Sequence, residues 1–370
     1  MIIPPMYGGT IKEFKSGDPY YFKGYEWLTK LSFDNVYLLL HAEWPSSEGY
    51  NLPDNYDFYV VSFHLEAVDI SWLKQQTKRI KGRILVLHDG NSYNYVIPKV
   101  TFFPYYYWHV TISRMQELFG NQRPERQITH KFSAFCNRIQ TSKLLVFTAL
   151  AENTTRDESL LALHEWYEEE NVYIDRNAPT KVVETYDLFF EKYFKKKVYK
   201  IDDFTNDLNY QHHTANPWTP AYQNAAIHFT NESFSTTYMY HTDTPYNLAI
   251  AKHPGPMFSE KTLKCLMGGT SFIPVCQYDA YGTLNRLGLN FNYDFDTSFD
   301  YEENDFKRWD KILRLIENLS ELSAETLYKM TKDCTEQNFA YVKEGVFYRE
   351  VEKLNAYTAE QVIEHIKQTA

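Results

Sequence analysis

The stretch FYVVSFHLEAVDISWLKQQTKRIKGRILVLHDG (58–90) decides the fold class of this chain. Its two ends, FYVVSFHLE and GRILVLHDG, are apolar runs of strand length that close on polar or turn residues. The segment between them places Ile70, Leu73 and Ile80 on one side of a helix and basic residues on its outer face. Strand, helix and strand at this spacing form a βαβ unit, which predicts an α/β fold with a parallel sheet.

Composition favours a globular protein of two domains. The 370 residues suit two domains of roughly 150–200 residues. The 31 tyrosines and 25 phenylalanines indicate packing in cores and interfaces, with stacking platforms for sugars or bases as the alternative. A net charge of −10 argues against non-specific nucleic-acid binding, although Lys192, Lys195, Lys196 and Lys197 form a local basic strip.

Cysteine usage and hydropathy favour a cytoplasmic protein, in the host cytoplasm if the protein is viral. The four cysteines lie far apart without a CxxC pair, so we expect no zinc site and no disulfide framework. The start of the chain, MIIPPMYGGTIKEF, does not have the pattern of a signal peptide. No apolar run reaches 18 residues, so we expect no membrane partner.

The chain continues in the same alternating pattern. A strand, a polar turn and a helix are expected over FCNRIQTSKLL (135–145), and strands over AAIHFTNES and TSFIPVCQ. LLALHEWYEEENVY is expected to form helices or a mixed segment, and 324–367 to form helices. We therefore expect a first domain over 1–125, a second over 126–345 and a C-terminal helix over 346–370.

The stretch FSEKTLKCLMGGT (258–270) combines a helix start with unusual charges. Ser259 is a suitable N-cap, and Glu260 in the first turn is favoured by the helix dipole. Lys261 in the same turn is unfavourable for helix stability, but it fits if its side chain meets a phosphate at this helix end. The following Gly268 and Gly269 permit close packing before the next strand.

Several of these pieces together resemble the donor domain of GT-B glycosyltransferases, especially the fucosyltransferase-like group with its viral, phage and bacterial relatives. The matching pieces, in order, are FCNRIQTSKLL (135–145), HFTNES (228–233), FSEKTLKCLMGGTSFIPV (258–275), TLNRLGLNF (283–291) and the acidic FDTSFDYEENDFKRWDKILRLIENL. The resemblance covers about 135–345. It implies two Rossmann-like domains facing across a cleft, with C-terminal helices.

The resemblance also implies a donor site for a nucleotide-diphosphate sugar, which is the co-substrate; no other cofactor and no metal is expected. Arg138, Lys143 and Lys261 would neutralise the diphosphate, whose charge grows as the sugar–phosphate bond breaks. Glu260, next to the N-cap Ser259, would hold the ribose, and Glu232 would lie near the donor sugar or base. The segment between Glu232 and the helix start is longer than the family pattern.

The acceptor side is expected in the first domain. A transferase that inverts configuration needs a base near the acceptor hydroxyl. Glu66 and Asp89 follow strongly apolar strands, where ligands of open α/β sheets bind, and are our candidates for the base. The acidic residues Asp294, Asp296, Asp300 and Asp305 precede a helix, and capping roles are more common for such residues than metal binding.

The expected function is transfer of a sugar to a hydroxyl of a glycan or small molecule. An alternative acceptor is hydroxymethylated cytosine in DNA, modified by a phage-type enzyme, for which the aromatic run FFPYYYWH (102–109) and the strip 192–197 would serve. An alternative of another class is a non-catalytic sugar-binding protein that has the same fold. The sugar, the nucleotide and the stereochemical outcome stay open.

Overall fold

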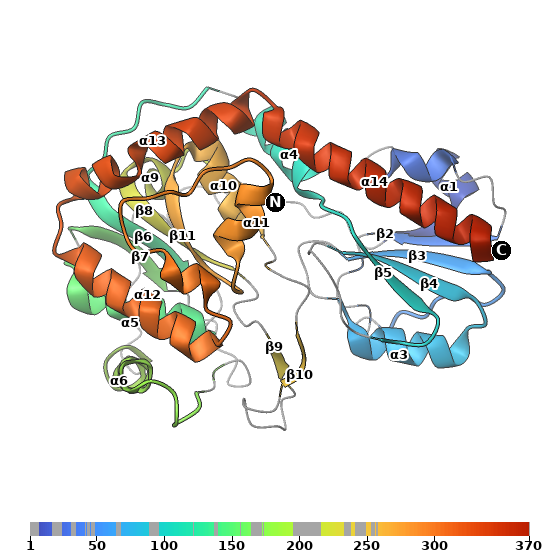
Figure 1. Ribbon diagram of the computed structural model, residues 1–370, viewed down its shortest axis with the longest axis horizontal. Helices are drawn as coiled ribbons and strands as arrows, with labels where there is room; N and C mark the ends of the chain where they lie inside the picture. Colours follow the sequence, from blue (N-terminus) through green and yellow to red (C-terminus); the bar gives the residue numbers. More distant parts are fainter. Residues whose placement is uncertain are drawn as a thin grey trace. The chain divides into compact units, whose positions relative to one another are not determined.

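The computed structural model of the chain describes residues 7–16, 24–30, 35–40, 42, 45, 49–63, 68–88, 96–120, 122–136, 140–155, 157–163, 172, 174–194, 216–232, 238–240, 249–252, 256 and 258–369. The chain divides into two compact units. The central unit contains residues 115–347, and the terminal unit contains residues 2–114 together with 348–370. Figure 1 shows that each unit is built on its own sheet with helices packed against it.

The terminal unit contains a five-stranded sheet in the order β1-β2-β3-β4-β5. The strands are β1 (Tyr7–Thr10), β2 (Val36–Leu40), β3 (Phe58–Phe63), β4 (Arg83–His88) and β5 (Val100–Pro104). β1 pairs antiparallel with β2, and the other neighbours pair parallel. The βαβ unit predicted over 58–90 is confirmed: α3 (Ile70–Arg79) joins β3 to β4 and is capped by Asp69, which accepts from the Trp72 amide at 2.9 Å.

Alternation along the strands gives this sheet a core on each face, because successive side chains point to opposite sides. One core contains residues of β2, β3 and β4 together with Val362 and Ile366 of α14 (Val346–Thr369). The other core contains the alternate residues of the same strands together with Trp72 and Leu73 of α3. The C-terminal segment of the chain thus completes the core of the unit that contains the N-terminal strands.

The central unit contains a four-stranded parallel sheet in the order β11-β8-β6-β7. The strands are β6 (His130–Cys136), β7 (Ser159–Leu163), β8 (Ala225–Asn231) and β11 (Ser271–Val275). α5 (Thr141–Asn153) and α12 (Asp305–Ser320) cover one face, and α10 (Glu260–Gly268) and α13 (Ala324–Lys343) cover the other (Figure 1). A mixed α/β fold with parallel sheets is therefore confirmed.

Shorter elements complete the two units. They are α1 (Ile11–Ser16), η1 (Glu26–Lys30), α4 (Trp108–Phe119), α6 (Thr180–Leu188), the π-helical η3 (Phe189–Phe194), α9 (Pro220–Gln223), β9 (Tyr238–Tyr240), β10 (Ala249–Lys252), α11 (Ala280–Arg286) and η4 (Ser298–Tyr301). SLLAL (159–163), expected within helices or a mixed segment, is strand β7, since its short apolar run pairs with β6. No helix within the described ranges is long and apolar enough to cross a membrane.

Candidate functional site

The strand order of the central sheet reverses between β6 and β8. β6 leads through α5 to β7 on one side, whereas β8 precedes α10 and β11 on the other side. Ligands of open α/β sheets bind at the carboxyl ends of the strands where such a reversal occurs. The carboxyl edge at β6 and β8 is therefore the candidate site that the topology defines.

The start of α10 is fixed to the carboxyl end of β8 by Glu232. This side chain is 1% exposed, and its carboxylate accepts hydrogen bonds from the Ser259 amide at 3.1 Å, from the Ser259 hydroxyl and from the Thr262 hydroxyl at 2.6 Å. Ser259 is the N-cap, as predicted, and accepts from the Lys261 amide at 3.3 Å. Both carboxylate oxygens of Glu232 are thus engaged within the chain.

Glu260 and Lys261 lie side by side in the first turn of α10. The Lys261 ammonium is 3.1 Å from the Ser259 hydroxyl and 3.4 Å from the Glu260 carboxylate. About a fifth of each side chain, 18% for Lys261 and 21% for Glu260, is exposed. Burial alone would raise the pKa of Glu260, but the neighbouring Lys261 and Lys264 outweigh it and lower this pKa to about 2. Glu260 is therefore a fixed carboxylate that can accept hydrogen bonds.

Three buried side chains, Ser133, Tyr222 and His228, lie next to this turn and are called the Tyr222 cluster below. The Lys264 ammonium lies 5.3 Å from the centre of the Tyr222 ring, which packs on His228 at 4.6 Å. The Nδ1 atom of His228 is 2.7 Å from the Ser133 hydroxyl. Burial, with the charges of Lys264 and Lys261, lowers the pKa of His228 to about 3, so its ring is neutral near pH 7. Lys264, Tyr222 and His228 are site residues that were not predicted from the sequence.

The N-terminus of α5 reaches the same edge from β6. Lys143 lies in its first turn and is 5% exposed, and its carbonyl accepts a hydrogen bond from Cys136 Sγ at 3.3 Å. Asn231 at the end of β8 donates to the Phe135 carbonyl at 3.1 Å, and its buried side-chain oxygen has no partner among the described residues. The predicted Arg138 lies outside the described residues.

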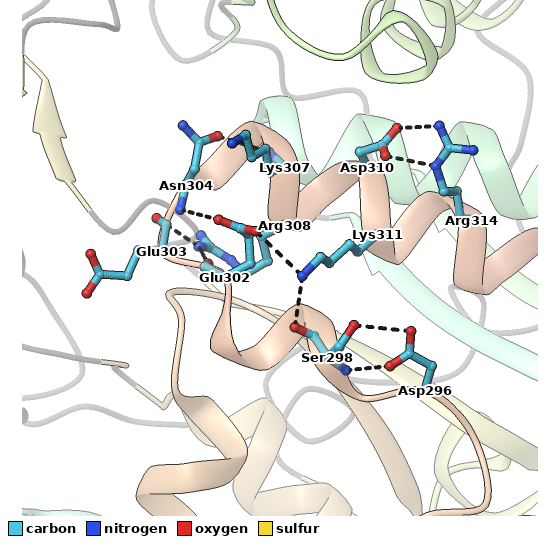
Figure 2. Close-up of polar contacts among 10 residues, drawn as sticks. All are labelled: Asp296, Ser298, Glu302, Glu303, Asn304, Lys307, Arg308, Asp310, Lys311 and Arg314. Carbon is cyan, nitrogen blue, oxygen red and sulfur yellow. Dashed lines mark hydrogen bonds and ion pairs between the residues drawn. The ribbon is translucent and has the colours of Figure 1, made fainter.

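The acidic segment before α12 stabilises local structure. Asp296 accepts from the Ser298 amide at 2.8 Å, and Asp300 accepts from the Tyr281 and Gly282 amides at the start of α11, each at 3.1 Å. Figure 2 shows Asp296 with Ser298, and Lys311 between Ser298 and Glu302. These contacts agree with the capping roles that we expected for this segment.

A buried ion pair lies in the first turn of α12. Asp305 forms a buried ion pair with Arg308, which also donates to the Cys276 carbonyl at 3.1 Å. Within the described part of the chain, no group of three or more His, Cys, Asp or Glu side chains is placed to hold a metal ion.

The acceptor-side candidates belong to the terminal unit. β3 and β4 are neighbouring parallel strands, so their carboxyl ends share one edge. Glu66 and Asp89, which follow them, both lie outside the described residues. In this unit, a cavity of about 810 Å³ lies between β5 and α14, and a cavity of about 270 Å³ lies beside Trp27 and Tyr105.

The aromatic run 102–109 and Lys192 of the basic strip, which would serve a DNA acceptor, have contacts within the chain. Tyr105, Tyr106, Tyr107 and Trp108 of the aromatic run are all buried in the terminal unit, with at most 6% exposure. Their packing matches the core interpretation of the aromatic excess, because a stacking platform needs an exposed ring face. Lys192 pairs with Glu152 at 2.6 Å, and Lys195, Lys196 and Lys197 lie outside the described residues.

No family model matches the chain. No curated protein matches it either.

Proposed function

We propose that this chain is a glycosyltransferase that binds a nucleotide-diphosphate sugar at the carboxyl edge of β6 and β8. The observation that supports the proposal is that α5 and α10, each with a lysine in its first turn, begin at the carboxyl ends of the neighbouring strands β6 and β8, where the strand order reverses. Helix N-termini favour anions through their dipoles, and ammonium groups add charge-assisted hydrogen bonds to phosphate. Two such ends suit a diphosphate.

The contacts at α10 refine how a donor would bind. Ser259 already occupies the Lys261 amide, so the Lys261 ammonium, rather than its amide, would contact the phosphate. Glu260, held as a carboxylate, would accept from the ribose hydroxyls. Glu232 would act indirectly by fixing the start of α10, since its oxygens bind Ser259 and Thr262. This role replaces the direct contact with the donor sugar that the resemblance implies.

Catalysis would follow from differential binding of the leaving diphosphate. Negative charge grows on the diphosphate as the sugar–phosphate bond breaks, so Lys143 and Lys261 would stabilise the transition state more than the ground state. The proposed enzyme has the GT-B arrangement of two Rossmann-like domains, with Glu66 or Asp89 as the base for the acceptor hydroxyl. The net charge of −10 favours a glycan or small molecule over DNA as the acceptor.

A transfer assay tests the proposal. The protein is incubated with a panel of radiolabelled nucleotide sugars and two acceptor pools, a mixture of oligosaccharides and DNA that contains hydroxymethylcytosine. We expect label on the oligosaccharides, with no competition by DNA. Label on DNA that decreases steeply with salt would instead identify the DNA acceptor. Donor binding without transfer to either pool would support a non-catalytic sugar-binding protein.

A further inference from the structure

The first two turns of α10 contain one carboxylate and two ammonium groups. Glu260 and Lys264 are four residues apart, so their side chains share a face of the helix. Lys261, next to Glu260, has its ammonium 3.4 Å from the same carboxylate. If Lys261 were the only cation near Glu260, the Glu260 carboxylate would hold the Lys261 ammonium in an ion pair. A phosphate would then have to compete with Glu260 for this ammonium.

Lys264 is fixed in place by the fold. Its side chain is 4% exposed, and its ammonium lies over the Tyr222 ring at 5.3 Å. Tyr222 is fixed in turn by His228, which contacts the Ser133 hydroxyl. The residues of the Tyr222 cluster come from β6, α9 and β8, so the position of the Lys264 ammonium depends on the packed sheet rather than on α10 alone.

The Tyr222 cluster carries little negative charge near pH 7. The ring of His228 is neutral there, and burial raises the pKa of Tyr222 well above its ordinary value. Burial lowers the pKa of Lys264 to about 8, and Glu260 opposes this effect more strongly than Glu232 does. Among the described residues, the ionisable groups that act on Glu260 or Lys264 include Tyr222 of α9, His228 of β8, Glu232 directly after β8, and Lys261 and Cys265 of α10. Glu260 is therefore the main carboxylate available to the Lys264 ammonium.

We propose that Lys264 is a positioning residue of the donor site: near pH 7 its buried ammonium is a fixed counter-charge for Glu260, so that Glu260 holds Lys261 less tightly and Lys261 can bind the donor diphosphate. This inference rests on the proposed function for the role of Lys261. The two lysines have different roles in this proposal. Lys264 neutralises the carboxylate from the buried side, and Lys261 binds phosphate on the partly exposed side.

The first test needs no ligand. The carboxyl pKa of Glu260 is measured by carbon-detected NMR in protein labelled at its glutamates, with Glu260→Gln to assign the signal. Lys264→Met, which keeps the length and loses the charge, is expected to raise this pKa from about 2 toward its ordinary value near 4.5. Lys264→Arg, which keeps the charge, is expected to leave it low. An unchanged pKa in a folded Lys264→Met protein would overturn the counter-charge role.

The second test measures pyrophosphate binding by calorimetry in the wild type, Lys264→Met, Glu260→Gln and the double variant. We expect Lys264→Met to weaken binding at least about fivefold, and Glu260→Gln to restore more affinity in the Lys264→Met protein than it adds to the wild type. Equal gains in both backgrounds would refute the competition for Lys261. Failure of the wild type to bind pyrophosphate and nucleoside diphosphates would overturn the proposed function, while the ligand-free titration would still decide whether Lys264 and Glu260 are coupled.

Discussion

Replacing Thr262 by valine removes one of the hydrogen bonds that fix the start of α10 to the end of β8. The Thr262 hydroxyl donates to the Glu232 carboxylate at 2.6 Å, and both side chains are buried, with exposures of 0% and 1%. A hydrogen bond to a charged group contributes about 1.5–3 kcal/mol, and valine keeps the volume. We therefore expect Thr262→Val to lower the free energy of unfolding by about 1.5–3 kcal/mol.

A double-mutant cycle with Glu232→Ala isolates this interaction. When Glu232 is absent, the Thr262 hydroxyl has lost its acceptor, so the second substitution should cost little and the coupling should be about as large as the single effect. The assay is urea unfolding followed by circular dichroism, with hydrogen exchange at the Ser259 amide as a local probe. Thr326→Val is the matched control, because this exposed threonine lies at the start of α13 and should change stability by under about 0.5 kcal/mol.

A coupling below about 0.5 kcal/mol would refute the reasoning. It would mean that Glu232 does not hold α10 in solution. Direct contact between Glu232 and a donor sugar, the expectation drawn from the family resemblance, would then be the better explanation of its position.

Three other predictions concern pH and catalysis. Because the folded pKa of His228 is about 3 and its ordinary value is 6.5, stability should fall as pH decreases below about 6.5, by on the order of 5 kcal/mol once pH is below about 3, and His228→Asn should flatten the dependence of the melting temperature on pH. Burial raises the pKa of Asp300 from 3.8 to about 6, so the stability that its protonated form contributes is lost as pH rises through about 6, and the melting temperature of Asp300→Ala should depend less on pH over this range than that of the wild type. Glu66→Gln or Asp89→Asn should lower the rate of transfer by roughly 10²–10⁴-fold with donor affinity retained, and full activity in both variants would place the base elsewhere.

The sequence predicts the elements whose signals are local. The period of the apolar residues over 58–90 is enough for β3, α3 and β4, and the cap at Ser259 marks the start of α10. Gly269, at the end of α10, has a left-handed φ of 59°, which explains one member of the glycine pair. In each case the deciding interactions lie within a few residues along the chain.

The remaining features depend on contacts between distant segments. The partners of Asp300, the Tyr281 and Gly282 amides, lie 19 and 18 residues away along the chain, so no local pattern identifies that cap. Strand β7 is too short for its period to exclude a helix, and only pairing with β6 decides it. The one local signal for Lys264 was its spacing of four residues from Glu260. The Tyr222 cluster, against which Lys264 is buried, forms only through tertiary packing.

Calorimetry of nucleoside diphosphate binding to the wild type and to Lys261→Ala tests the donor site most directly. Loss of a charge-assisted phosphate contact should cost about 1.5–3 kcal/mol, which is roughly a 10- to 150-fold loss of affinity with the fold intact. Lys329→Ala, which removes a lysine that is 70% exposed on α13, should bind like the wild type. A wild type that binds no nucleoside diphosphate, or equal affinities of the wild type and Lys261→Ala, would contradict the account.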